Sequence, residues 1–504
     1  MSLRLETRNL SKSFGEFAAV SSVSLTFEPG LIHAVLGENG AGKSTLMKLL
    51  FALHRPSSGE IWLDGKRAEF ANSADAIAAG LGMVQQHFSI VENLSVIDNV
   101  ILGAEPTDIF GRLNRKRAIE QLEALLPSKN LRLDWFAPVE QLSVGEKQKI
   151  EILKLLFRRA KILFLDEPTA VLTPQEILDF FQVLRDLKNQ GRSIVLITHK
   201  LGEVMQICDT YTVLRHGKLI DSGSVAHASV DSLVESMIGK KLGTFNMTLT
   251  EPGTEVALKA GFLKSNSADG RRGRLSGASF EVRSGEIVGI AGVEGSGQSD
   301  LVEMIFGGLG FSGDLEILGK KVSSSGARQA RELGVGLVPE DRQHQGLWMT
   351  ESCHLNMAIG LEERFLNWGL IDFTKLNQTT ASWAKNFDVR ASSLNVAAQH
   401  LSGGNQQKLI FARELVGRKP RLLICHQPTR GVDLGAIDLI HRQLIELRNR
   451  GLGILLMSSE LDELLKLSDR IAVLYEGRIS AEFFRRDFDP MKIGAAMTGT
   501  NHAH

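Results

Sequence analysis

The sequence predicts an α/β protein with two tandem domains, each a mainly parallel β-sheet wrapped by helices. Short apolar runs such as LIHAVLG, KILFLDE and SIVLIT alternate with helical patterns such as QEILDFFQVLRDLKN, as expected for buried parallel strands covered by helices. Motifs from the first half of the chain also return in the same order about 260 residues later. A repeat this long indicates two homologous domains and excludes a short solenoid repeat.

The composition is that of an ordinary globular protein. The 504 residues exceed the size of one core, and 43% are apolar and 23% charged. Equal numbers of basic and acidic residues, 58 each, leave no footprint for nucleic acid or an anionic membrane surface. The start of the chain, MSLRLETRNLSKSF, lacks the apolar core of a signal peptide, and no stretch approaches the ~20 apolar residues of a spanning helix. We expect a cytosolic chain, or one attached to a membrane through a partner.

Three cysteines, Cys208, Cys353 and Cys425, are odd in number and share no metal-ligand spacing. We expect buried free thiols in a reducing compartment.

The repeated motifs also set the expected domain boundaries. Residues 239–256 are polar, turn-rich and without periodicity, which is typical of a joint. We therefore predict a first domain at 1–242, a linker at 243–255 and a second domain at 256–504. Several helical patterns between 90 and 160 predict a helical subdomain on the first sheet. The segments that repeat are HAVLGENGAGKSTLMKLLF (33–51) and GIAGVEGSGQSDLVEMIF (289–306), LSVGEKQK (142–149) and LSGGNQQK (401–408), and SIVLITHKLGEV (193–204) and GILLMSSELDEL (453–464).

Residues 37–44, GENGAGKS, satisfy the phosphate-binding pattern G-x-x-x-x-G-K-[ST] between an apolar strand and a helix. Glycines let backbone N–H groups point at phosphate oxygens, the helix N-terminus adds a favourable field, Lys43 adds charge, and Ser44 can ligate Mg²⁺. We call this segment the first P-loop. The ATP contacts expected there are Gly37, Glu38, Asn39, Gly40, Ala41, Gly42, Lys43, Ser44 and Thr45.

The strand KILFLDE ends in Asp166 and Glu167. An aspartate at this strand end would hold Mg²⁺ near Ser44, and the glutamate would orient or activate a water for attack on a γ-phosphate. Two acids after an apolar run are more often the solvated start of a loop. The P-loop upstream and the Pro168-Thr169 pair that follows favour the catalytic interpretation.

These motifs resemble those of ATP-binding cassette (ABC) ATPases, over nearly the whole chain. LSVGE and LSGGNQ resemble the family signature, which caps the γ-phosphate of nucleotide bound to the opposite cassette. The resemblance makes His199 the switch histidine, and Gln86, or neighbouring Gln85 in a shifted register, the Q-loop glutamine beside Mg²⁺ and the membrane partner. Phe14 would stack on adenine, although a lone phenylalanine more often packs in a core. The implied fold is a P-loop NTPase domain with a helical subdomain and an antiparallel β part.

In the second copy, the same comparison removes the catalytic groups. Gln298 replaces the P-loop lysine, His426 the magnesium aspartate, Gln427 the catalytic glutamate, Ser459 the switch histidine and Glu340 the Q-loop glutamine. Each change deletes a charge or proton-transfer group, or adds a negative charge beside phosphate. We expect no hydrolysis there. The other residues of this degenerate P-loop are Gly292, Gly297 and Ser299.

The family arranges its cassettes head to tail, and the losses then sort onto one composite site. The first P-loop would meet the second signature, and the second P-loop would meet a first signature that contains Val144 and Glu146, with Thr173 in place of an aspartate. We expect one hydrolytic site and one structural or regulatory site. The residues that complete the first are Ser402, Gly403, Gly404, Gln406 and Asp433, and those beside the second are Ser143 and Gly145.

The resemblance implies an ATPase with ATP and Mg²⁺ as ligands that energises a bacterial importer of nucleosides or simple sugars. Its implied partners are integral permease subunits, expected to be two, and indirectly a solute-binding protein, at the cytoplasmic face of the inner membrane. Contact with the permease would involve residues 86–110 and 340–360. The QPTRG variant favours nucleosides over sugars. The alternative is a soluble tandem cassette protein acting on ribosomes or DNA, which usually has two intact sites, a charged linker or a basic surface.

Overall fold

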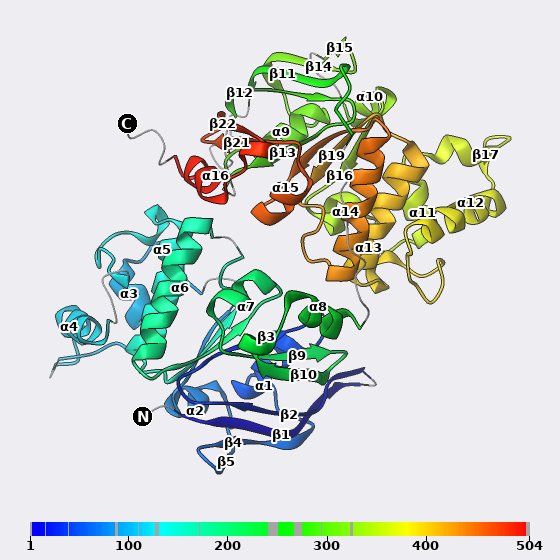
Figure 1. Ribbon diagram of the computed structural model, residues 1–504. Helices are drawn as coiled ribbons and strands as arrows, with labels where there is room; N and C mark the ends of the chain where they lie inside the picture. The colour runs from blue at the N-terminus through cyan, green and yellow to red at the C-terminus, as the bar shows by residue number, and fades with distance from the viewer. Residues whose placement is uncertain are drawn as a thin grey trace. The chain divides into compact units, whose positions relative to one another are not determined.

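The computed structural model describes residues 3–15, 17–38, 40–85, 89–108, 110–126, 131–170, 172–239, 250–266, 275–293, 295–322 and 326–499. The chain divides into two compact units, 1–243 and 244–504 (Figure 1). Each unit has a six-stranded, mainly parallel sheet and a four-stranded antiparallel sheet, which confirms the predicted fold class. The exact linker at 243–255 stays a prediction. Within the described ranges, no helix has the length and apolar character needed to cross a bilayer.

The central sheet of unit 1 has the order β10-β9-β3-β8-β7-β6, and all neighbours are parallel except β9 and β10. Strands β3 and β8 are buried at every residue, as expected for a parallel sheet covered on both faces. Because the strands are parallel, their carboxyl ends lie at one edge, where β3 and β7 deliver the phosphate-binding and acidic motifs. The strands are β3 (Ile32–Leu36), β6 (Leu81–Val84), β7 (Ile162–Asp166), β8 (Ser193–Ile197), β9 (Thr210–Arg215) and β10 (Lys218–Ser224).

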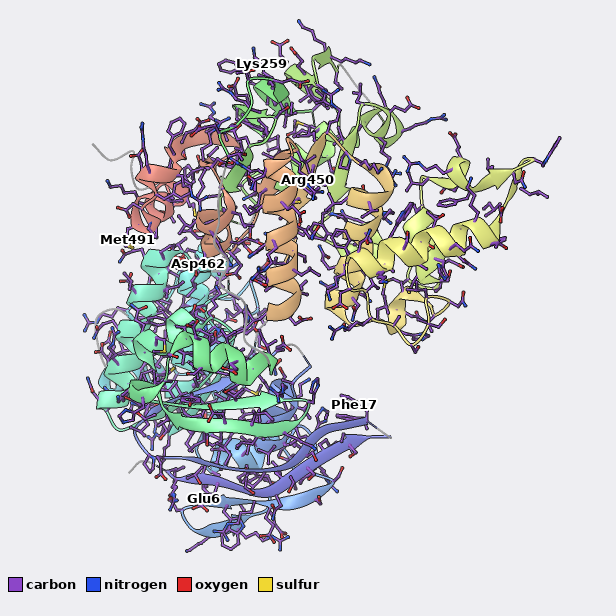
Figure 2. The ribbon with its side chains drawn as sticks, turned by 45° about the vertical axis from the view of Figure 1, so that its right-hand side comes forward. Glu6, Phe17, Lys259, Arg450, Asp462 and Met491 are labelled. Carbon is purple, nitrogen blue, oxygen red and sulfur yellow. The ribbon has the colours of Figure 1, made fainter. Side chains whose placement is uncertain are left out.

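The second sheet of unit 1 is antiparallel, in the order β2-β1-β4-β5. Its apolar face shares a core with β3, β7, β8 and the first helix, through residues such as Leu10, Phe27 and Phe164. Phe17, at the start of β2, is 64% exposed and is labelled in Figure 2. The strands are β1 (Leu5–Phe14), β2 (Phe17–Phe27), β4 (Ser58–Leu63) and β5 (Lys66–Ala68).

The helices of unit 1 include the predicted helical subdomain, formed by α3, α4 and α5, which contact one another. The long helix α6 follows the acidic strand end, and α1 follows the P-loop. The helices are α1 (Lys43–Leu50), α2 (Ser73–Ala78), α3 (Val96–Ile101), α4 (Arg115–Leu125), α5 (Val144–Phe157), α6 (Pro174–Asn189), α7 (Leu201–Ile207) and α8 (Val230–Ile238).

Unit 2 repeats this plan, with sheets β16-β19-β20-β13-β21-β22 and β12-β11-β14-β15 and a small β17-β18 hairpin. The strands are β11 (Val256–Ser265), β12 (Ser276–Arg283), β13 (Ile287–Ala291), β14 (Phe311–Ile317), β15 (Lys320–Lys321), β16 (Val335–Val338), β17 (Leu366–Asn367), β18 (Leu370–Ile371), β19 (Leu422–His426), β20 (Gly453–Met457), β21 (Arg470–Tyr475) and β22 (Arg478–Phe484). The helices are α9 (Gln298–Ile305), α10 (Ala327–Glu332), α11 (Cys353–Ala358), α12 (Phe373–Asn386), α13 (Gly403–Phe411), α14 (Leu434–Asn449), α15 (Leu461–Leu467) and α16 (Pro490–Met497).

One local difference between the units has a simple cause in the sequence. The chain from Ser402 to His426 is one residue longer than the matching stretch from Ser143 to Asp166. In unit 2, α13 continues as a π-helical segment, Ala412–Arg418, and π-helical turns accommodate an extra residue without breaking the helix. The extra residue between the signature and the end of β19 is therefore taken up within the helix. All three cysteines are free and buried, as predicted.

Candidate nucleotide-binding site

The first P-loop connects β3 to α1, and its backbone passes too close to neighbouring strands for ordinary side chains. A Cβ at Gly37 would lie 2.4 Å from the Leu214 carbonyl oxygen, and a Cβ at Gly42 would lie 2.4 Å from that of Ala19. Gly42 also has φ 101°, a conformation that favours glycine. These glycines keep the loop tight, so that its N–H groups and the start of α1 can receive a phosphate. Asn39 lies outside the described residues.

Lys43 is the first residue of α1, and its side chain folds back over the loop. Its Nζ donates to the carbonyl oxygens of Gly37 (2.7 Å) and Glu38 (3.0 Å). The residue is 7% exposed, and burial lowers the pKa of the ammonium, against the opposing charges of Glu167 and Asp166. An ammonium removed from water in this way is well placed to exchange carbonyl oxygens for phosphate oxygens.

Ser44 and Asp166 meet as the sequence predicted. The Ser44 hydroxyl lies 3.4 Å from Oδ2 of Asp166, although the two residues are 122 positions apart. Burial raises the pKa of the Asp166 carboxyl, and the neighbouring charge of Glu167 raises it further. Two carboxylates and a hydroxyl at one strand end suit a hard cation with oxygen ligands. Among the residues that the structure describes, no three His, Cys, Asp or Glu side chains form a group that could hold a metal ion by themselves.

Glu167 sits on a left-handed turn at the end of β7, with φ 46°, and its N–H donates to the Ile197 carbonyl (2.9 Å). Its Oε1 lies 2.9 Å from Nδ1 of His199, which follows β8. This hydrogen bond is the main cause of a pKa for Glu167 below the usual range of a glutamate. The carboxylate therefore stays ionised and is held in one orientation, which suits it to position a water more than to accept a proton.

The two remaining predicted contacts in unit 1 are Phe14 and Gln86. Phe14 is 47% exposed, which excludes the core-packing alternative and leaves the ring available. It lies edge-on to His54, with ring centroids 5.5 Å apart. Gln86 lies outside the described residues, and its neighbour Gln85 is exposed.

Unit 2 retains the same scaffold around different atoms. Gln298 begins α9, and its amide donates to the Val293 carbonyl (3.1 Å), where Lys43 contacts its own loop in unit 1. Gln427 has φ 52°, and its Oε1 accepts from the N–H (3.0 Å) and hydroxyl (3.1 Å) of Ser459. His426 is buried, and burial lowers its pKa, so that the magnesium position holds a neutral ring. The backbone of unit 2 therefore follows that of unit 1 at these positions, although the side chains that phosphoryl transfer uses are missing.

The charge expected at Glu340 is compensated. Its Oε1 accepts from Nη1 of Arg430 at 2.6 Å, and its Oε2 lies 3.6 Å from Nε2 of His426. The expectation that this acid simply adds negative charge beside a phosphate is therefore incomplete. Its sequence neighbours gave no sign of the pairing, because Arg430 is 90 residues away.

The two signature segments cap their helices differently. Glu146 forms a capping box with Ser143: its carboxylate accepts from the Ser143 N–H (2.9 Å), and the Ser143 hydroxyl accepts from the Glu146 N–H (3.2 Å). A carboxylate of the chain itself thus occupies the α5 N-terminus, an end of a helix that favours negative charge. In unit 2, the matching Asn405 donates its amide to the Ser402 hydroxyl (2.9 Å). The first signature thus has an acid at the position where the second has an amide.

The carboxylate that packs on each signature glycine comes from a different position in each unit. A Cβ on Gly404 would lie 2.4 Å from Oδ2 of Asp433, the N-cap of α14. A Cβ on Gly145 would lie 2.5 Å from Oε1 of Glu176, which forms a capping box with Thr173 at the start of α6. Thr173 stands where unit 2 has Asp433, and the carboxylate that packs against the signature glycine in unit 1 is instead that of Glu176, three residues further along.

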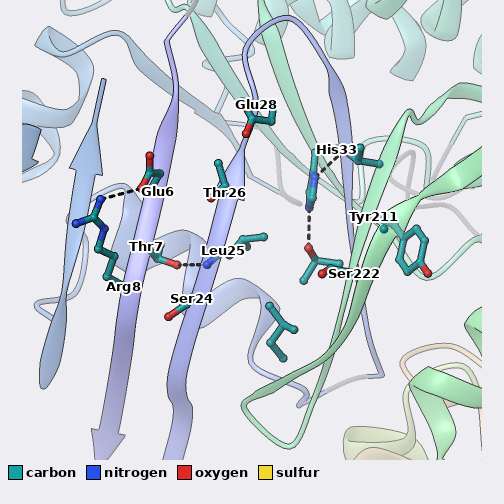
Figure 3. Close-up of a pocket in the computed structure, with 14 residues that line it drawn as sticks. Glu6, Thr7, Arg8, Ser24, Leu25, Thr26, Glu28, His33, Tyr211 and Ser222 are labelled. Carbon is teal, nitrogen blue, oxygen red and sulfur yellow. Dashed lines mark hydrogen bonds and ion pairs between the residues drawn. The ribbon is translucent and has the colours of Figure 1, made fainter. Parts of the chain in front are cut away.

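A pocket of about 540 Å³ lies between β1–β2 and β9–β10 in unit 1 (Figure 3). It contains His33, near the start of β3 and hence at the opposite end of that strand from the P-loop. Burial lowers the pKa of His33 to about 4, and its ring nitrogens lie 2.9 Å from the hydroxyls of Thr210 and Thr212. The pocket is therefore separate from the nucleotide site, and no sequence motif indicated it.

Comparison with known proteins now defines the class. The profile of the ABC transporter family matches residues 20–170 and 275–430. The chain belongs to this family, with two cassettes in one polypeptide.

Full-length relatives narrow the comparison. The chain is 40% identical to the nucleoside import ATP-binding protein NupA of Lactococcus lactis subsp. cremoris, over 98% of this chain and 97% of that protein. It is also 40% identical to the guanosine import ATP-binding protein NupO of Bacillus subtilis, with the same shares covered. The ribose import ATP-binding protein RbsA 2 of Streptomyces avermitilis is 38% identical, again over 98% and 97%.

Proposed function

We propose that this protein is the ATP-hydrolysing, energy-coupling subunit of a nucleoside importer. The observation that carries the proposal is the convergence of Lys43, Ser44, Asp166, Glu167 and His199 at the carboxyl ends of β3, β7 and β8. This set provides a cation for phosphate, oxygen ligands for a metal and an oriented carboxylate for water, which are the groups that phosphoryl transfer requires.

In the proposed chemistry, the N–H groups of the P-loop and Lys43 bind the β- and γ-phosphates. Asp166, Ser44 and Gln86 would hold Mg²⁺, which supplies charge neutralisation to the phosphates. Glu167 orients the attacking water, and His199 holds Glu167 and reaches the γ-phosphate. Phe14 offers its exposed ring to the adenine.

We assign hydrolysis to the first P-loop alone. As the family resemblance implies, Ser402, Gly403, Gly404, Gln406 and Asp433 would complete the γ-phosphate contacts of that site. The second P-loop, with Gln298, His426, Gln427 and Ser459, would have a structural or regulatory role. The capping of Ser143 by Glu146 supports this division, because an internal carboxylate competes with phosphate at the first signature.

Transport requires partners in the membrane. We propose two permease subunits on the cytoplasmic side of the inner membrane and, acting through them, a solute-binding protein. The segment 88–96, which leads from β6 into the start of α3, would form a principal contact with the permease. Two features favour nucleosides over sugars. Two of the relatives, NupA and NupO, are named import ATP-binding proteins for nucleosides and for guanosine, and this chain has the QPTRG variant at residues 427–431.

The decisive test is Glu167→Gln, measured as steady-state ATP hydrolysis and ATP binding by the purified chain. The amide removes the water-orienting carboxylate but no phosphate ligand, so turnover is expected to fall by about 100-fold or more while ATP stays bound. Gln427→Glu, the matched change in unit 2, is expected to restore little, because the lysine, aspartate and histidine equivalents are missing too. Wild-type turnover in Glu167→Gln at saturating ATP would show that the site assignment is wrong.

A further inference from the structure

The guanidinium of Arg342 joins three separate segments of unit 2. Arg342 begins the π-helical segment Arg342–Gly346, which follows β16. Its Nη1 donates to the Arg430 carbonyl (2.7 Å), its Nη2 to that of Gly431 (3.5 Å), and its Nε to Oε1 of Gln406 (3.2 Å). One side chain thus links the segment after β16, the loop after β19 and the signature helix α13.

The glycine turn of the signature lies directly against this guanidinium. A Cβ on Gly403 would come within 2.5 Å of Nη2 of Arg342 and 3.0 Å of the Gly431 carbonyl oxygen. Gln406 is 3% exposed, and its own amide donates to the Ala398 carbonyl (3.1 Å), so its position is fixed from both ends. Movement of the guanidinium would therefore change the support beneath the first turn of α13.

An ion pair between Glu340 and Arg430 holds the same loop through a side chain. Arg342 binds the backbone carbonyl of Arg430, and Glu340, two residues earlier, binds the Arg430 side chain at 2.6 Å. Three residues further on, Asp433 caps α14 and packs against Gly404. The loop 430–433 is thus fixed to Arg342 at one end and to the signature at the other.

Unit 1 lacks the side chains that make these contacts in unit 2. The residues at the matching sequence positions are Phe88, Val144, Lys147, Ala170 and Val171, none of which reproduces the guanidinium, the glutamine or the glycines. The contacts that Arg342 makes to residues 406, 430 and 431, which we call the Arg342 bracket, therefore occur in the unit whose signature keeps its double glycine. A purely general support of the fold would be needed in both units.

We propose that Arg342 is a positioning residue for ATP hydrolysis, which holds the signature turn Ser402–Gly404 in the shape that receives the γ-phosphate of ATP on the first P-loop. The inference rests on the proposed function, in which that signature completes the first site. ATP first binds through the Lys43 loop, whereas the signature acts on the phosphate during turnover. Loss of Arg342 is therefore expected to lower kcat with little change in KM, because small misplacements of charge-stabilising groups act on the transition state.

The test compares Arg342→Ala and Arg342→Lys with Arg328→Ala in the full chain. Arg328 is an exposed arginine of the same unit, on α10, and its ion pair with Glu332 is solvent-exposed. We expect Arg342→Ala to lose at least about tenfold in kcat, with KM for ATP within about twofold of wild type. Arg342→Lys is expected to lose nearly as much, because an ammonium lacks the planar fork that spans three acceptors. Arg328→Ala is expected to match wild type.

Folding and function are separated by two further measurements. If Arg342→Ala does not fold, Arg342→Lys decides, because it breaks the hydrogen bonds of the guanidinium with a smaller change in volume. A kcat within twofold of Arg328→Ala in the folded variants, or a loss confined to KM, overturns the inference. Glu167→Gln, measured in parallel, separates failure of the proposed function from failure of this inference. If Glu167→Gln keeps full turnover, the proposed function itself is wrong. If Glu167→Gln is inactive while the Arg342 variants have normal turnover, only the positioning role of Arg342 is refuted.

Discussion

At the residue scale, the buried carboxylate of Asp166 at the proposed catalytic site lowers the stability of the folded chain. Asp166 has a raised pKa because it is buried next to Glu167. A carboxyl whose folded pKa lies above its unfolded pKa is destabilising when it is ionised at neutral pH, and the penalty disappears as the pH falls through the folded pKa. Replacing Asp166 by a neutral residue should therefore stabilise the nucleotide-free chain and remove a ligand of the proposed metal site.

Asp166→Asn tests this balance. We expect it to raise the Tm of the nucleotide-free chain at neutral pH by roughly 1 to 3 °C and to abolish Mg²⁺-dependent hydrolysis. The stability difference from wild type should shrink at acidic pH, where Asp166 is protonated. Calorimetry across pH, with and without Mg-ATP, measures both effects. A lower Tm for Asp166→Asn at neutral pH would contradict the assignment of an unfavourable buried charge.

Some side-chain partners at these sites could be predicted from the sequence, and others could not. Ser44 and Asp166 were paired correctly because their motifs have defined places at the ends of parallel strands. The partner of Glu340 was not predictable, since Arg430 is 90 residues away and only the folded chain brings it near. The partner of Glu146 lies three residues away in a Ser-x-x-Glu pattern, which is a capping-box signature that the interpretation as a charge near phosphate overlooked. Acid residues interpreted as charges near phosphate proved to be bound by an arginine and by a helix N-terminus.

At the element scale, the segment between β6 and α3 is fastened to the helical subdomain. Ser89 donates its N–H to Glu151 (2.9 Å) and accepts from Lys154 (2.6 Å), and both partners lie on α5. Asn99, fully buried on α3, binds the N–H (2.8 Å) and carbonyl (3.0 Å) of Val91. A force on this segment therefore reaches α5 directly. The helices were predictable from their periodicity, whereas these cross-connections were not, because they involve backbone groups.

Val91→Glu and Glu92→Lys test the coupling role of this segment. Val91 is 43% exposed, so the charge is tolerated by the fold but would disturb a permease interface. We expect solute uptake in cells to be abolished while the purified chain still binds ATP. Val230→Glu, at a 45% exposed valine on α8, is the matched control and is expected to leave uptake intact. Normal uptake in both segment variants would refute the coupling role.

At the scale of the whole molecule, the two signatures allow a matched comparison. Ser143 and Ser402 are both N-caps, of α5 and α13, and each hydroxyl accepts from the N–H three residues on (3.2 and 3.5 Å). Replacing either by arginine removes a similar cap, and similar losses of stability follow.

Their effects on hydrolysis are expected to differ. Ser402→Arg should lower ATP turnover by at least about tenfold, because bulk then opposes the γ-phosphate of the working site. Ser143→Arg should be clearly milder, since in the proposed arrangement its signature serves the degenerate P-loop. Turnover of the two purified variants, normalised to their folded fraction from thermal unfolding, provides the measurement. Equal loss of hydrolysis from both would argue against a single working site.

The left-handed turn at the end of β7 is preserved at the end of β19, with φ 46° at Glu167 and 52° at Gln427. In each unit the turning N–H donates to the last carbonyl of the neighbouring strand, Ile197 (2.9 Å) or Met457 (2.8 Å). The bend is thus imposed by the sheet and is indifferent to whether an acid or an amide occupies it. The two units therefore differ at this strand end in an exchangeable side chain and agree in the backbone that carries it, so that the acid can be replaced by an amide without a change in the path of the chain.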